Sequence, residues 1–406
     1  MSENPKIKSI RYAATLTGEE HTGRWDVYGT DLGIPVYSPS QNRMYFLFGD
    51  TSGIGEIDPA KPRNWRGTVA GYTESFDFTE GVRWDGFLDD GTGKARHLVP
   101  AHYTPDSKRE EKTKISQGGI EIDGKLYVFY ESINNWGVPG AGRWILNFGG
   151  TLRSSDGGKT FEKVYDLTWL EPTGGEELET AARIAAETMD NRPSEIVFDA
   201  AAHIAPGFGQ DYAVDGRDGY IYLYGRVGGR VYGIKVGRVK KENFETFSAW
   251  EYLTAFEDGK PVWKPYREGL DALIAEPEKA EIIPGPTSNM SVQYNAYLGK
   301  WLLTYYVQRT GIRYAVSDTP YGPYTEPELF LPREHPELLQ FLPEETQRSI
   351  ASKEARIPYN FLYGGFTHEK MNREGGRIVP IVVSNWYPTG EKTRFYGSRL
   401  FEIEFE

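Results

Sequence analysis

The stretch Met44-Tyr45-Phe46-Leu47-Phe48 is the first of five short hydrophobic runs that recur along this chain of 406 residues. The other four are Leu126-Tyr-Val-Phe-Tyr130, Ile221-Tyr-Leu-Tyr224, Trp301-Leu-Leu-Thr-Tyr305 and Ile378-Val-Pro-Ile-Val-Val383. Each run follows a polar or glycine-containing turn of the kind that a tight hairpin needs. The runs begin at residues 44, 126, 221, 301 and 378, so successive starts lie 82, 95, 80 and 77 residues apart. A period of that size suits one four-stranded sheet with its loops.

Five such repeats predict an all-β fold, a five-bladed β-propeller that forms a single domain over residues 1–406. Arranging sheets radially around an axis protects the strand edges that a single open sheet would expose. We expect the N-terminal strand around Ile7 to Leu16 to pair in the same blade as Phe395 to Phe405, which closes the ring. Three stretches rich in Glu, Ala and Leu at helical spacing interrupt the β pattern. They predict helical insertions in loops at residues 176–190, 264–279 and 327–356.

The composition supports a β fold and narrows the range of partners. Aromatic residues make up 14% of the chain, which also holds 46 Gly and 25 Pro, a profile of short strands and frequent turns. The net charge of -12 disfavours binding to nucleic acid. The sequence contains no run of about 18 apolar residues, so it predicts no membrane span. No export signal is recognisable in the first 17 residues, so a cytoplasmic protein and a secreted one whose signal has been removed are both open.

The segment from Ser154 to Phe161 fits the Ser-x-Asp-x-Gly-x-Thr-aromatic pattern known as an Asp box. In such a box the Asp and Ser or Thr side chains bond the backbone of a hairpin. We therefore interpret Asp156 as a structural residue. A related segment, from Ser317 to Tyr324, occupies the equivalent place two blades later.

Two aspartates flank the first hydrophobic run, and both are expected at the open end of one hairpin. Facing residues in an antiparallel hairpin share a constant sum of residue numbers, and pairing of Asp31 with Asp50 centres the turn between Ser40 and Gln41, where turn chemistry also places it. Without a bulge, the two side chains would face each other with Cβ atoms about 5 Å apart. Such a pair either performs acid/base or nucleophilic work on a glycosidic bond, or merely caps loop backbone.

Several motifs resemble those of glycoside hydrolase family 183, the endo-D-arabinanases formerly filed as a domain of unknown function. They are Gly29-Thr-Asp31-Leu-Gly-Ile-Pro, Phe48-Gly-Asp50-Thr, Asn64-Trp-Arg66, Ser291-Val-Gln293-Tyr-Asn-Ala-Tyr-Leu-Gly-Lys-Trp301, Thr319-Pro-Tyr-Gly-Pro-Tyr324, Tyr363-Gly-Gly and Ser384-Asn-Trp386. The resemblance runs from about Trp25 to the C-terminus. It implies endo-acting cleavage of α-D-arabinofuranosyl linkages, with Asp31 and Asp50 as the essential pair. Asn385 stands where the family pattern has Gln, a departure that bears on sugar specificity.

The candidate substrate-binding residues lie near predicted strand ends. Aromatic candidates for stacking on sugar rings are Trp25, Trp65, Tyr294, Tyr363 and Trp386, for which packing is the alternative. Polar candidates for bonding sugar hydroxyls are Arg66, Gln117, Gln210, Asn289, Gln293 and His368, which alternatively bond loop backbone. The six His show no zinc-ligand spacing, and the Gly-rich stretches lack the context of a phosphate loop. We therefore expect neither a metal nor a cofactor.

The function predicted from the sequence is hydrolysis of an arabinofuranosyl polysaccharide of the D-arabinan type. A glycosidase of other specificity, either another furanosidase or a sialidase, is one alternative. The sialidase would need converging arginines, for which Arg66, Arg83, Arg226 and Arg313 are the candidates. A non-enzymatic glycan-binding propeller is the other alternative. Direct pairing of the two aspartates predicts a retaining mechanism, with Asp50 as the nucleophile and Asp31 as the acid/base.

Overall fold

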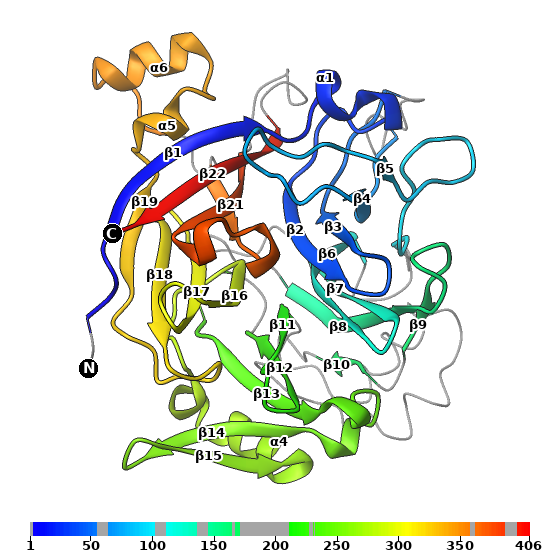
Figure 1. Cartoon of the computed structure of the whole chain (residues 1–406), viewed down its shortest axis with the longest axis vertical. Coiled ribbons are helices and arrows are strands. Elements are labelled where there is room, and N and C mark those ends of the chain that lie inside the picture. The colour runs from blue at the N-terminus through cyan, green and yellow to red at the C-terminus, as the bar shows by residue number, and fades with distance from the viewer. Residues whose placement is uncertain are drawn as a thin grey trace. The chain divides into compact units, whose positions relative to one another are not determined.

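The computed structural model describes residues 3–54, 64–101, 111–135, 145–164, 167–170, 211–226, 230, 232–357, 362–385 and 396–406. These residues form mostly strands, arranged in five antiparallel sheets, and the fold is the five-bladed β-propeller that the repeats predict (Figure 1). By their contacts the residues divide into two compact units. Unit 1 comprises Met1–Leu98, Ser288–Asp318 and Thr325–Glu406, and unit 2 comprises Val99–Thr287 and Thr319–Tyr324.

Unit 1 holds three sheets, which we number by their order along the chain. Sheet I consists of β2 (Leu32–Ser38), β3 (Arg43–Phe48), β4 (Val69–Thr73) and β5 (Gly86–Phe87). Sheet IV consists of β16 (Met290–Asn295), β17 (Lys300–Val307), β18 (Gly311–Ser317) and β19 (Glu328–Pro332). Sheet V consists of β20 (Leu362–Phe366), β21 (Ile378–Asn385), β22 (Gly397–Phe405) and β1 (Ile7–Thr15).

Unit 2 holds the other two sheets. Sheet II consists of β6 (Thr113–Ile122), β7 (Lys125–Asn135), β8 (Ile145–Ser154), β9 (Glu162–Lys163) and β10 (Trp169–Leu170). Sheet III consists of β11 (Tyr212–Asp215), β12 (Tyr220–Gly225), β13 (Lys235–Lys240), β14 (Glu251–Glu257) and β15 (Lys260–Pro265). In all five sheets the repeated hydrophobic run is the second strand, namely β3, β7, β12, β17 and β21. These strands have neighbours on both sides, which explains their continuous hydrophobic character.

The predicted closure of the ring by the N-terminal strand is confirmed. Strand β1 pairs antiparallel with β22, so that Ile10 faces Ile403 and Tyr12 faces Phe401. Figure 1 shows the two strands, one blue and one red, running side by side. The first strand of the chain thus completes a sheet whose other three strands come from the last 45 residues, from Leu362 to Glu406.

Short helices occur in the loops. They are α1 (Glu19–Thr22), α4 (Tyr266–Ala275), α5 (Pro336–Leu339) and α6 (Glu344–Ala351), with 3₁₀ turns η1 (Gly23–Trp25), η2 (Lys241–Asn243), η3 (Phe247–Ala249), η4 (Pro277–Ala280), η5 (Glu369–Met371) and η6 (Glu374–Gly376). Residues 264–279 hold α4 and η4, although their first two residues end β15. The stretch 327–356 holds α5 and α6, but its expected helical start is wrong. There Glu328–Pro332 forms β19, because Phe330 and Leu331 are buried when this backbone pairs with β18. The predicted helix at 176–190 lies outside the described residues.

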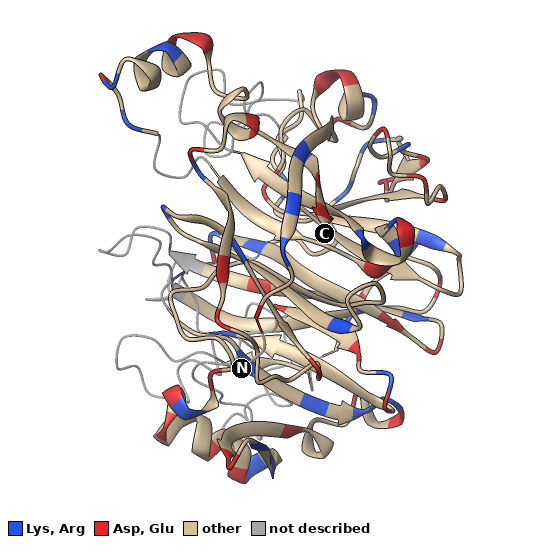
Figure 2. Ribbon diagram, turned by 60° about the vertical axis from the view of Figure 1, so that its left-hand side comes forward, with Lys and Arg blue, Asp and Glu red and all other residues tan. Residues whose placement is uncertain are grey.

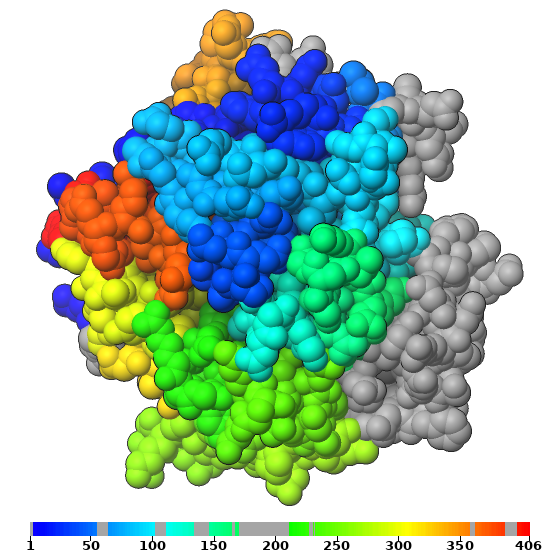
Figure 3. All heavy atoms as spheres, turned by 45° about the vertical axis from the view of Figure 1, so that its right-hand side comes forward, coloured from blue at the N-terminus to red at the C-terminus, as the bar shows by residue number. Residues whose placement is uncertain are grey.

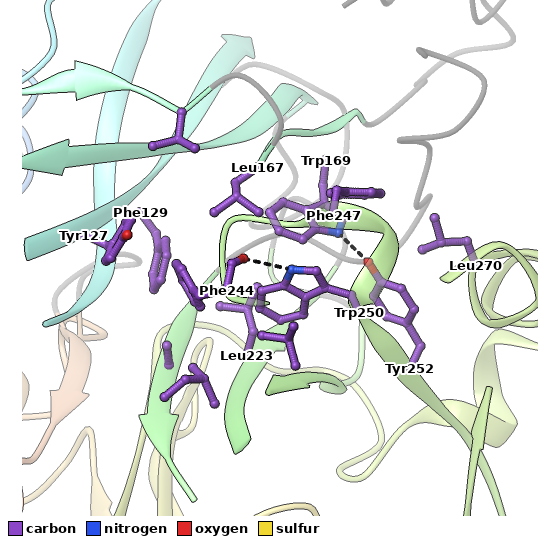
Figure 4. Packing of buried hydrophobic residues seen from close by; sticks show 14 of the residues in the cluster. Tyr127, Phe129, Leu167, Trp169, Leu223, Phe244, Phe247, Trp250, Tyr252 and Leu270 are labelled. Carbon is purple, nitrogen blue, oxygen red and sulfur yellow. Dashed lines mark hydrogen bonds between the residues drawn. The ribbon is translucent and has the colours of Figure 1, made fainter. Parts of the chain in front are cut away.

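A cluster of aromatic side chains forms the core of unit 2. Trp169 and Trp250 are fully buried in it, packed edge to face with ring centroids 5.7 Å apart. The indole of Trp250 donates to the carbonyl of Phe244 at 3.2 Å, and that of Trp169 donates to the Tyr252 hydroxyl at 3.0 Å (Figure 4). Both polar N–H groups therefore find partners, which buried Trp requires.

The Asp box forms the hairpin turn that the sequence predicts. Oδ1 of Asp156 accepts hydrogen bonds from the Ser154 hydroxyl and the Thr160 N–H, and Oδ2 accepts one from the Thr160 hydroxyl. The bonds from Thr160 are the main reason that the pKa of Asp156 falls to about 2. The structural interpretation of Asp156 is confirmed.

Charged residues are distributed widely over the fold. Figure 2 shows Lys and Arg residues scattered among Asp and Glu residues along the strands and loops. No helix in the described part of the chain is long and apolar enough to cross a membrane.

Candidate active site

The hairpin of β2 and β3 has the predicted register over most of its length. Ile34 faces Leu47 and Ser38 faces Arg43, and in both pairs the residue numbers add up to 81. The pair of Leu32 and Phe48 adds up to 80, whereas the bridge of Gly29 with Ser52 returns to 81. Each strand thus carries one extra residue near the open end, and the two bulges compensate each other.

The direct pairing of Asp31 with Asp50 is wrong, because these bulges lie where the two residues would meet. The carbonyl of Asp31 accepts a hydrogen bond from the N–H of Gly49, at 3.2 Å, in place of one from Asp50. Leu32 and Gly33, which follow Asp31, have φ angles of 64° and 91°, in the left-handed region. The prediction of a retaining mechanism loses its basis, since it used the short distance of a directly facing pair.

Asp31 is held by tyrosines from another sheet. Its Oδ2 accepts hydrogen bonds from the hydroxyl of Tyr363, at 2.8 Å, and from that of Tyr396, at 2.5 Å. Tyr363 lies on β20 and Tyr396 directly precedes β22, so both belong to sheet V. Strands β20 and β21 contact β2, and Figure 3 shows blue atoms of the first sheet beside orange atoms of the last. Asp31 therefore lies at the contact between sheet I and sheet V.

Gly49 provides the space that the Asp31 carboxylate occupies. A Cβ atom at this position would lie 2.3 Å from Oδ1 of Asp31 and 3.4 Å from its Cγ. Separations below about 3 Å do not occur between such atoms, so a side chain here would push the carboxylate away. Gly49 directly follows β3, and the close approach of another group explains a glycine at this position.

Two serines hold the backbone that follows Asp31. The hydroxyls of Ser384 and Ser398, which face each other across β21 and β22, both donate to the carbonyl of Leu32 at 3.0 Å. A left-handed conformation costs a branched residue such as Leu32 about 1–2 kcal/mol. The two hydrogen bonds offset this cost and fix the direction in which Asp31 leaves the sheet.

Asp50 lies within electrostatic reach of the same tyrosine. Burial raises the pKa of Tyr396 well above its ordinary value, and the neighbouring Asp31, Tyr363 and Asp50 raise it further. Tyr396 therefore remains protonated and keeps its donor role throughout the physiological pH range. Asp50 is half-buried, and the next residue, Thr51, bonds the Thr30 hydroxyl at 2.6 Å and the Gly49 carbonyl at 2.8 Å. The segment that carries Asp50 is thus fixed on both sides.

We expect Tyr396→Phe to reduce the turnover of a cleaved polysaccharide about tenfold, which corresponds to one hydrogen bond to a charged group. The ring would still fill its place, so circular dichroism and the melting temperature should show a folded protein. Tyr37→Phe is the matched control, since the Tyr37 hydroxyl bonds Asn42 at the other end of β2 and should be dispensable. Equal turnover by the two variants would show that the hydrogen bond from Tyr396 to Asp31 does not contribute to the reaction.

Most of the chain matches one known protein family. Residues 17–401 match the family described as "Domain of unknown function (DUF4185)". The chain belongs to the DUF4185 family. No curated protein matches it by sequence.

Solved structures share the fold of this DUF4185 chain. A proposed hydrolase from Bacteroides ovatus ATCC 8483 is 16% identical and superimposes with a TM-score of 0.55, covering 94% of this chain and 87% of that one. A protein of unknown function from Dyadobacter fermentans DSM 18053 is 10% identical, with a TM-score of 0.47 and coverage of 98% and 100%. A family 117 glycoside hydrolase from Zobellia galactanivorans is 9% identical, with a TM-score of 0.43 and coverage of 99% and 91%. At these identities the likeness is one of fold.

Three predicted binding residues of the DUF4185 chain pack in or around sheet I. The Trp25 ring lies between the guanidinium of Arg24, 3.7 Å from its centroid, and the Phe87 ring at 5.1 Å. Arg66 is buried and donates to the backbone carbonyls of Ala95 and Asp26. These contacts favour the packing interpretation for Trp25 and the backbone-bonding one for Arg66. The third residue, Trp65, meets the His97 ring edge to face at 6.1 Å.

Asp26 is a structural residue that the sequence analysis did not single out. Its carboxylate accepts hydrogen bonds from the N–H of Ile54, at 2.7 Å, and from the side-chain amide of Asn64, at 2.5 Å. It also lies 3.7 Å from the Arg66 guanidinium. Asp26 therefore bonds Ile54 and Asn64, which lie on either side of residues 55–63 in the sequence.

Three other predicted binding residues of unit 1 contact residues other than the two aspartates. The ring centroids of His368 and Tyr37 lie 6.4 Å apart, near the end of β2 that is far from Asp31. Tyr37 is six residues beyond Asp31, and six residues of strand span about 20 Å. Gln293 accepts a hydrogen bond from Asn372, which follows η5 in the same region as His368. Tyr294 packs edge to face on Trp301 at 5.6 Å. The contacts of His368 and Gln293 thus lie towards the far end of β2, and the ring contact of Tyr294 favours the packing interpretation.

The remaining predicted residues divide into three groups. Asn289 directly precedes β16, is buried, and its side-chain Oδ1 makes no hydrogen bond with any described residue, so it stays a candidate for a sugar hydroxyl. Gln117 belongs to unit 2, where it donates to Glu131 at 3.0 Å. Gln210 and Trp386 lie outside the described residues. Within the described ranges, no group of three His, Asp or Glu side chains gathers so as to hold a metal ion.

His368→Asn should leave hydrolysis unchanged and make the fold less sensitive to acid. Burial, aided by Lys370, lowers the pKa of His368 from 6.5 to about 4, so the unfolded chain binds more protons between these pH values. Stability therefore falls as the pH drops from about 6.5 to about 4, and part of this loss should disappear in the variant. Asn retains an acceptor for the Lys370 N–H that His368 now caps. Melting temperatures across this pH range test the prediction, and identical pH dependence in both proteins would contradict it.

Proposed function

We propose that this protein is a glycoside hydrolase that cleaves a polysaccharide within its chain, with Asp31 and Asp50 as the two catalytic carboxylic acids. The observation that carries the proposal is the Asp31 carboxylate at a doubly bulged hairpin end, bonded by two tyrosine hydroxyls from sheet V, one of which, Tyr396, also lies within electrostatic reach of Asp50. Glycoside hydrolysis requires two carboxyl groups in different environments, one ionised and one able to donate a proton.

The contacts favour a division of roles that differs from the one predicted from register. Two hydroxyl donors on one carboxylate oxygen stabilise the ionised form. We therefore assign Asp31 to the step that needs a carboxylate, which is attack on the anomeric carbon or activation of a water. Asp50 would then donate its proton to the leaving glycosidic oxygen. The proton leaves with the released sugar hydroxyl and is replaced from water at the end of the cycle.

The substrate class proposed is an arabinofuranosyl polysaccharide of the D-arabinan type. It is supported by the family 183 motifs around Asp31 and Asp50 and by membership of the DUF4185 family. The Bacteroides ovatus structure supports the general hydrolase assignment through its shared fold.

Two observations weigh against the other functions considered. The Asp31 carboxylate accepts hydrogen bonds from two tyrosines of a different sheet, which supports a role beyond capping the backbone of its own loop. A sialidase would need free arginines for the substrate carboxylate. Three of its four candidate arginines have internal partners: Arg66 and Arg313 donate to backbone carbonyls, and Arg226 lies 3.3 Å from Asp211.

The proposed function is tested by incubating the protein with D-arabinan, L-arabinan, xylan and a sialylated oligosaccharide, and measuring the new reducing ends. We expect reducing ends from D-arabinan alone. Cleavage of L-arabinan or xylan instead would keep the reaction class and overturn the sugar assignment. Cleavage of none of the four by a folded protein would count against the enzyme and for the binding module.

A further inference from the structure

Unit 1 has a polar pocket beside Tyr396 that the proposed chemistry does not use. Its volume is about 460 Å³, and it lies among the end of β1, helix α1 and the start of β22. Side chains from these segments and from Tyr28 supply hydroxyl groups and one guanidinium to its walls. The lining residues that carry these groups are Thr15, Thr17, Tyr28, Tyr396 and Arg399.

Arg399 is a buried cation that has no acidic partner among the described residues. Its exposed fraction is 7%, and no carboxylate in the described part of the chain lies within 4.0 Å of it. Its Nη1 donates to the Ser398 carbonyl at 3.2 Å, its guanidinium lies 4.9 Å from the Phe341 ring centroid, and its Nε makes no hydrogen bond with a described residue. Burial lowers its pKa to about 10.

Two other well-buried arginines have an acidic neighbour, and a third bonds two backbone carbonyls. Arg66 lies 3.7 Å from Asp26, and Arg226 lies 3.3 Å from Asp211. Arg333 gives its two terminal nitrogens to the carbonyls of Arg309 and Ile357. A buried charge without an anion destabilises a fold, so its retention at the wall of a pocket is best explained by a ligand.

We propose that this pocket binds a sugar-sized ligand that carries an oxyanion, either a carboxylate or a phosphate, and that Arg399 is the partner of that oxyanion. A guanidinium presents parallel N–H donors that match a carboxylate or phosphate edge, and Nε is one of them. The volume is within the range of small-molecule sites. Tyr28 and Thr15 line the pocket and can bond the hydroxyl groups of a sugar, although the Thr15 hydroxyl also bonds the Tyr12 hydroxyl at 2.8 Å.

The acidic mouth of the pocket favours one orientation of the ligand. Glu19 and Glu20 line it and are exposed. They repel a second negative charge at the entrance and accept hydrogen bonds from neutral hydroxyls. The ligand therefore enters with its oxyanion towards Arg399 and its polyol part towards α1.

The pocket adjoins the candidate active site through a single side chain. Tyr396 lines the pocket, and its hydroxyl donates to Oδ2 of Asp31. A ligand held by Arg399 would therefore contact the residue that positions Asp31. Binding at this pocket does not depend on the proposed hydrolase function, and only its effect on turnover would.

Isothermal titration calorimetry tests the proposal with D-glucuronate, D-glucose 6-phosphate, D-glucose and inorganic phosphate as probes. We expect at least one of the two charged sugars to bind at least about tenfold more tightly than glucose and than phosphate, since both halves of the ligand are recognised. Whichever charged sugar binds more tightly identifies the oxyanion. Binding of the charged sugars no tighter than glucose would overturn the proposal, as would inorganic phosphate binding as tightly as they do.

Arg399→Gln should weaken the binding of the charged sugar at least about tenfold while the melting temperature stays equal or rises, because an unpaired buried charge has been removed. Arg11→Gln is the matched control, since Arg11 lies on neighbouring β1, is exposed and pairs with Glu402, and this variant should bind as the parent does. Undiminished binding by Arg399→Gln would contradict the assignment.

If Arg399→Gln does not fold, Tyr28→Phe decides the question, because it removes only a hydroxyl from the pocket wall. Weaker binding of the charged sugar would support the site, and unchanged binding would overturn it. The titrations need no hydrolysis, so they can be repeated on Asp31→Asn. Binding by that variant keeps the pocket proposal independent of the outcome for the proposed reaction.

Discussion

Asp31→Asn and Asp50→Asn should each reduce the turnover of D-arabinan by at least about a thousandfold. An amide can neither attack the anomeric carbon, nor take a proton from water, nor donate one to the leaving oxygen. Asn has nearly the shape of Asp, so the two tyrosine hydroxyls that now bond Asp31 would keep an acceptor in place. The loss should therefore appear in kcat, with circular dichroism unchanged.

Asp156→Asn is the control for these two variants. Asp156 accepts three hydrogen bonds within its own turn, so the amide should lower the melting temperature by a few degrees and leave the turnover per folded molecule intact. Near-parental turnover by either Asp31→Asn or Asp50→Asn, on a substrate that the parent cleaves, would remove that residue from the mechanism.

Gly49→Ala should reduce turnover about a hundredfold, although residue 49 carries no chemistry. The new methyl group would lie 2.3 Å from Oδ1 of Asp31, so the carboxylate has to move by about an ångström. Displacements of this size cost reactions about two orders of magnitude when they affect a reacting group. The expected loss is in kcat, measured with purified, folded protein.

Gly216→Ala separates crowding from catalysis. A Cβ at Gly216 would approach the Tyr222 ring to the same 2.3 Å, but in unit 2 and against a side chain without a catalytic role. Gly216→Ala crowds three atoms below 3 Å and should lose at least as much stability as Gly49→Ala, yet Gly49→Ala alone should lose turnover. Equal turnover by the two would mean that the position of the Asp31 carboxylate is not critical.

The architecture was predictable because each blade repeats the same local pattern. The hydrophobic run of the second strand and the turn before it are short-range features, and the turns have the positive φ angles they imply, as at Asn42, Gly219 and Gly299. The pairing of β1 with β22 was predictable from closure of the ring. The expected helix over Glu328–Pro332 failed because the pairing with β18, a tertiary interaction, decided the conformation of that segment.

The site was less predictable than the fold, for a reason visible in the first hairpin. The constant sum of residue numbers holds from Ser38 to Ile34 and again at Gly29, so the turn position gives no sign of the two compensating bulges between them. The left-handed φ angle of Leu32 could not be predicted from the sequence either, because leucine has no preference for that conformation. The chemistry of the two aspartates could thus be inferred, and their register could not.

Residues that reach the site from distant parts of the chain were the hardest to predict. Tyr396 lies 365 positions from Asp31 and precedes a strand, so a sequence full of tyrosines gives it no distinction. Gly49 could have been suspected, because a glycine between a hydrophobic run and an aspartate interrupts a strand for a reason. Arg399 lies in an ordinary strand pattern, and only the folded structure shows that no described carboxylate pairs with it.

The most direct measurement compares the parent with the Asp31→Asn, Asp50→Asn double variant on D-arabinan, with the products separated by size over time. We expect the parent to shorten the polymer early, through internal cleavage, to a ladder of oligosaccharides, and the folded double variant to leave the polymer intact. Oligosaccharides produced equally by both proteins, or by neither, would contradict the claim that this pair of aspartates cleaves an arabinofuranosyl chain.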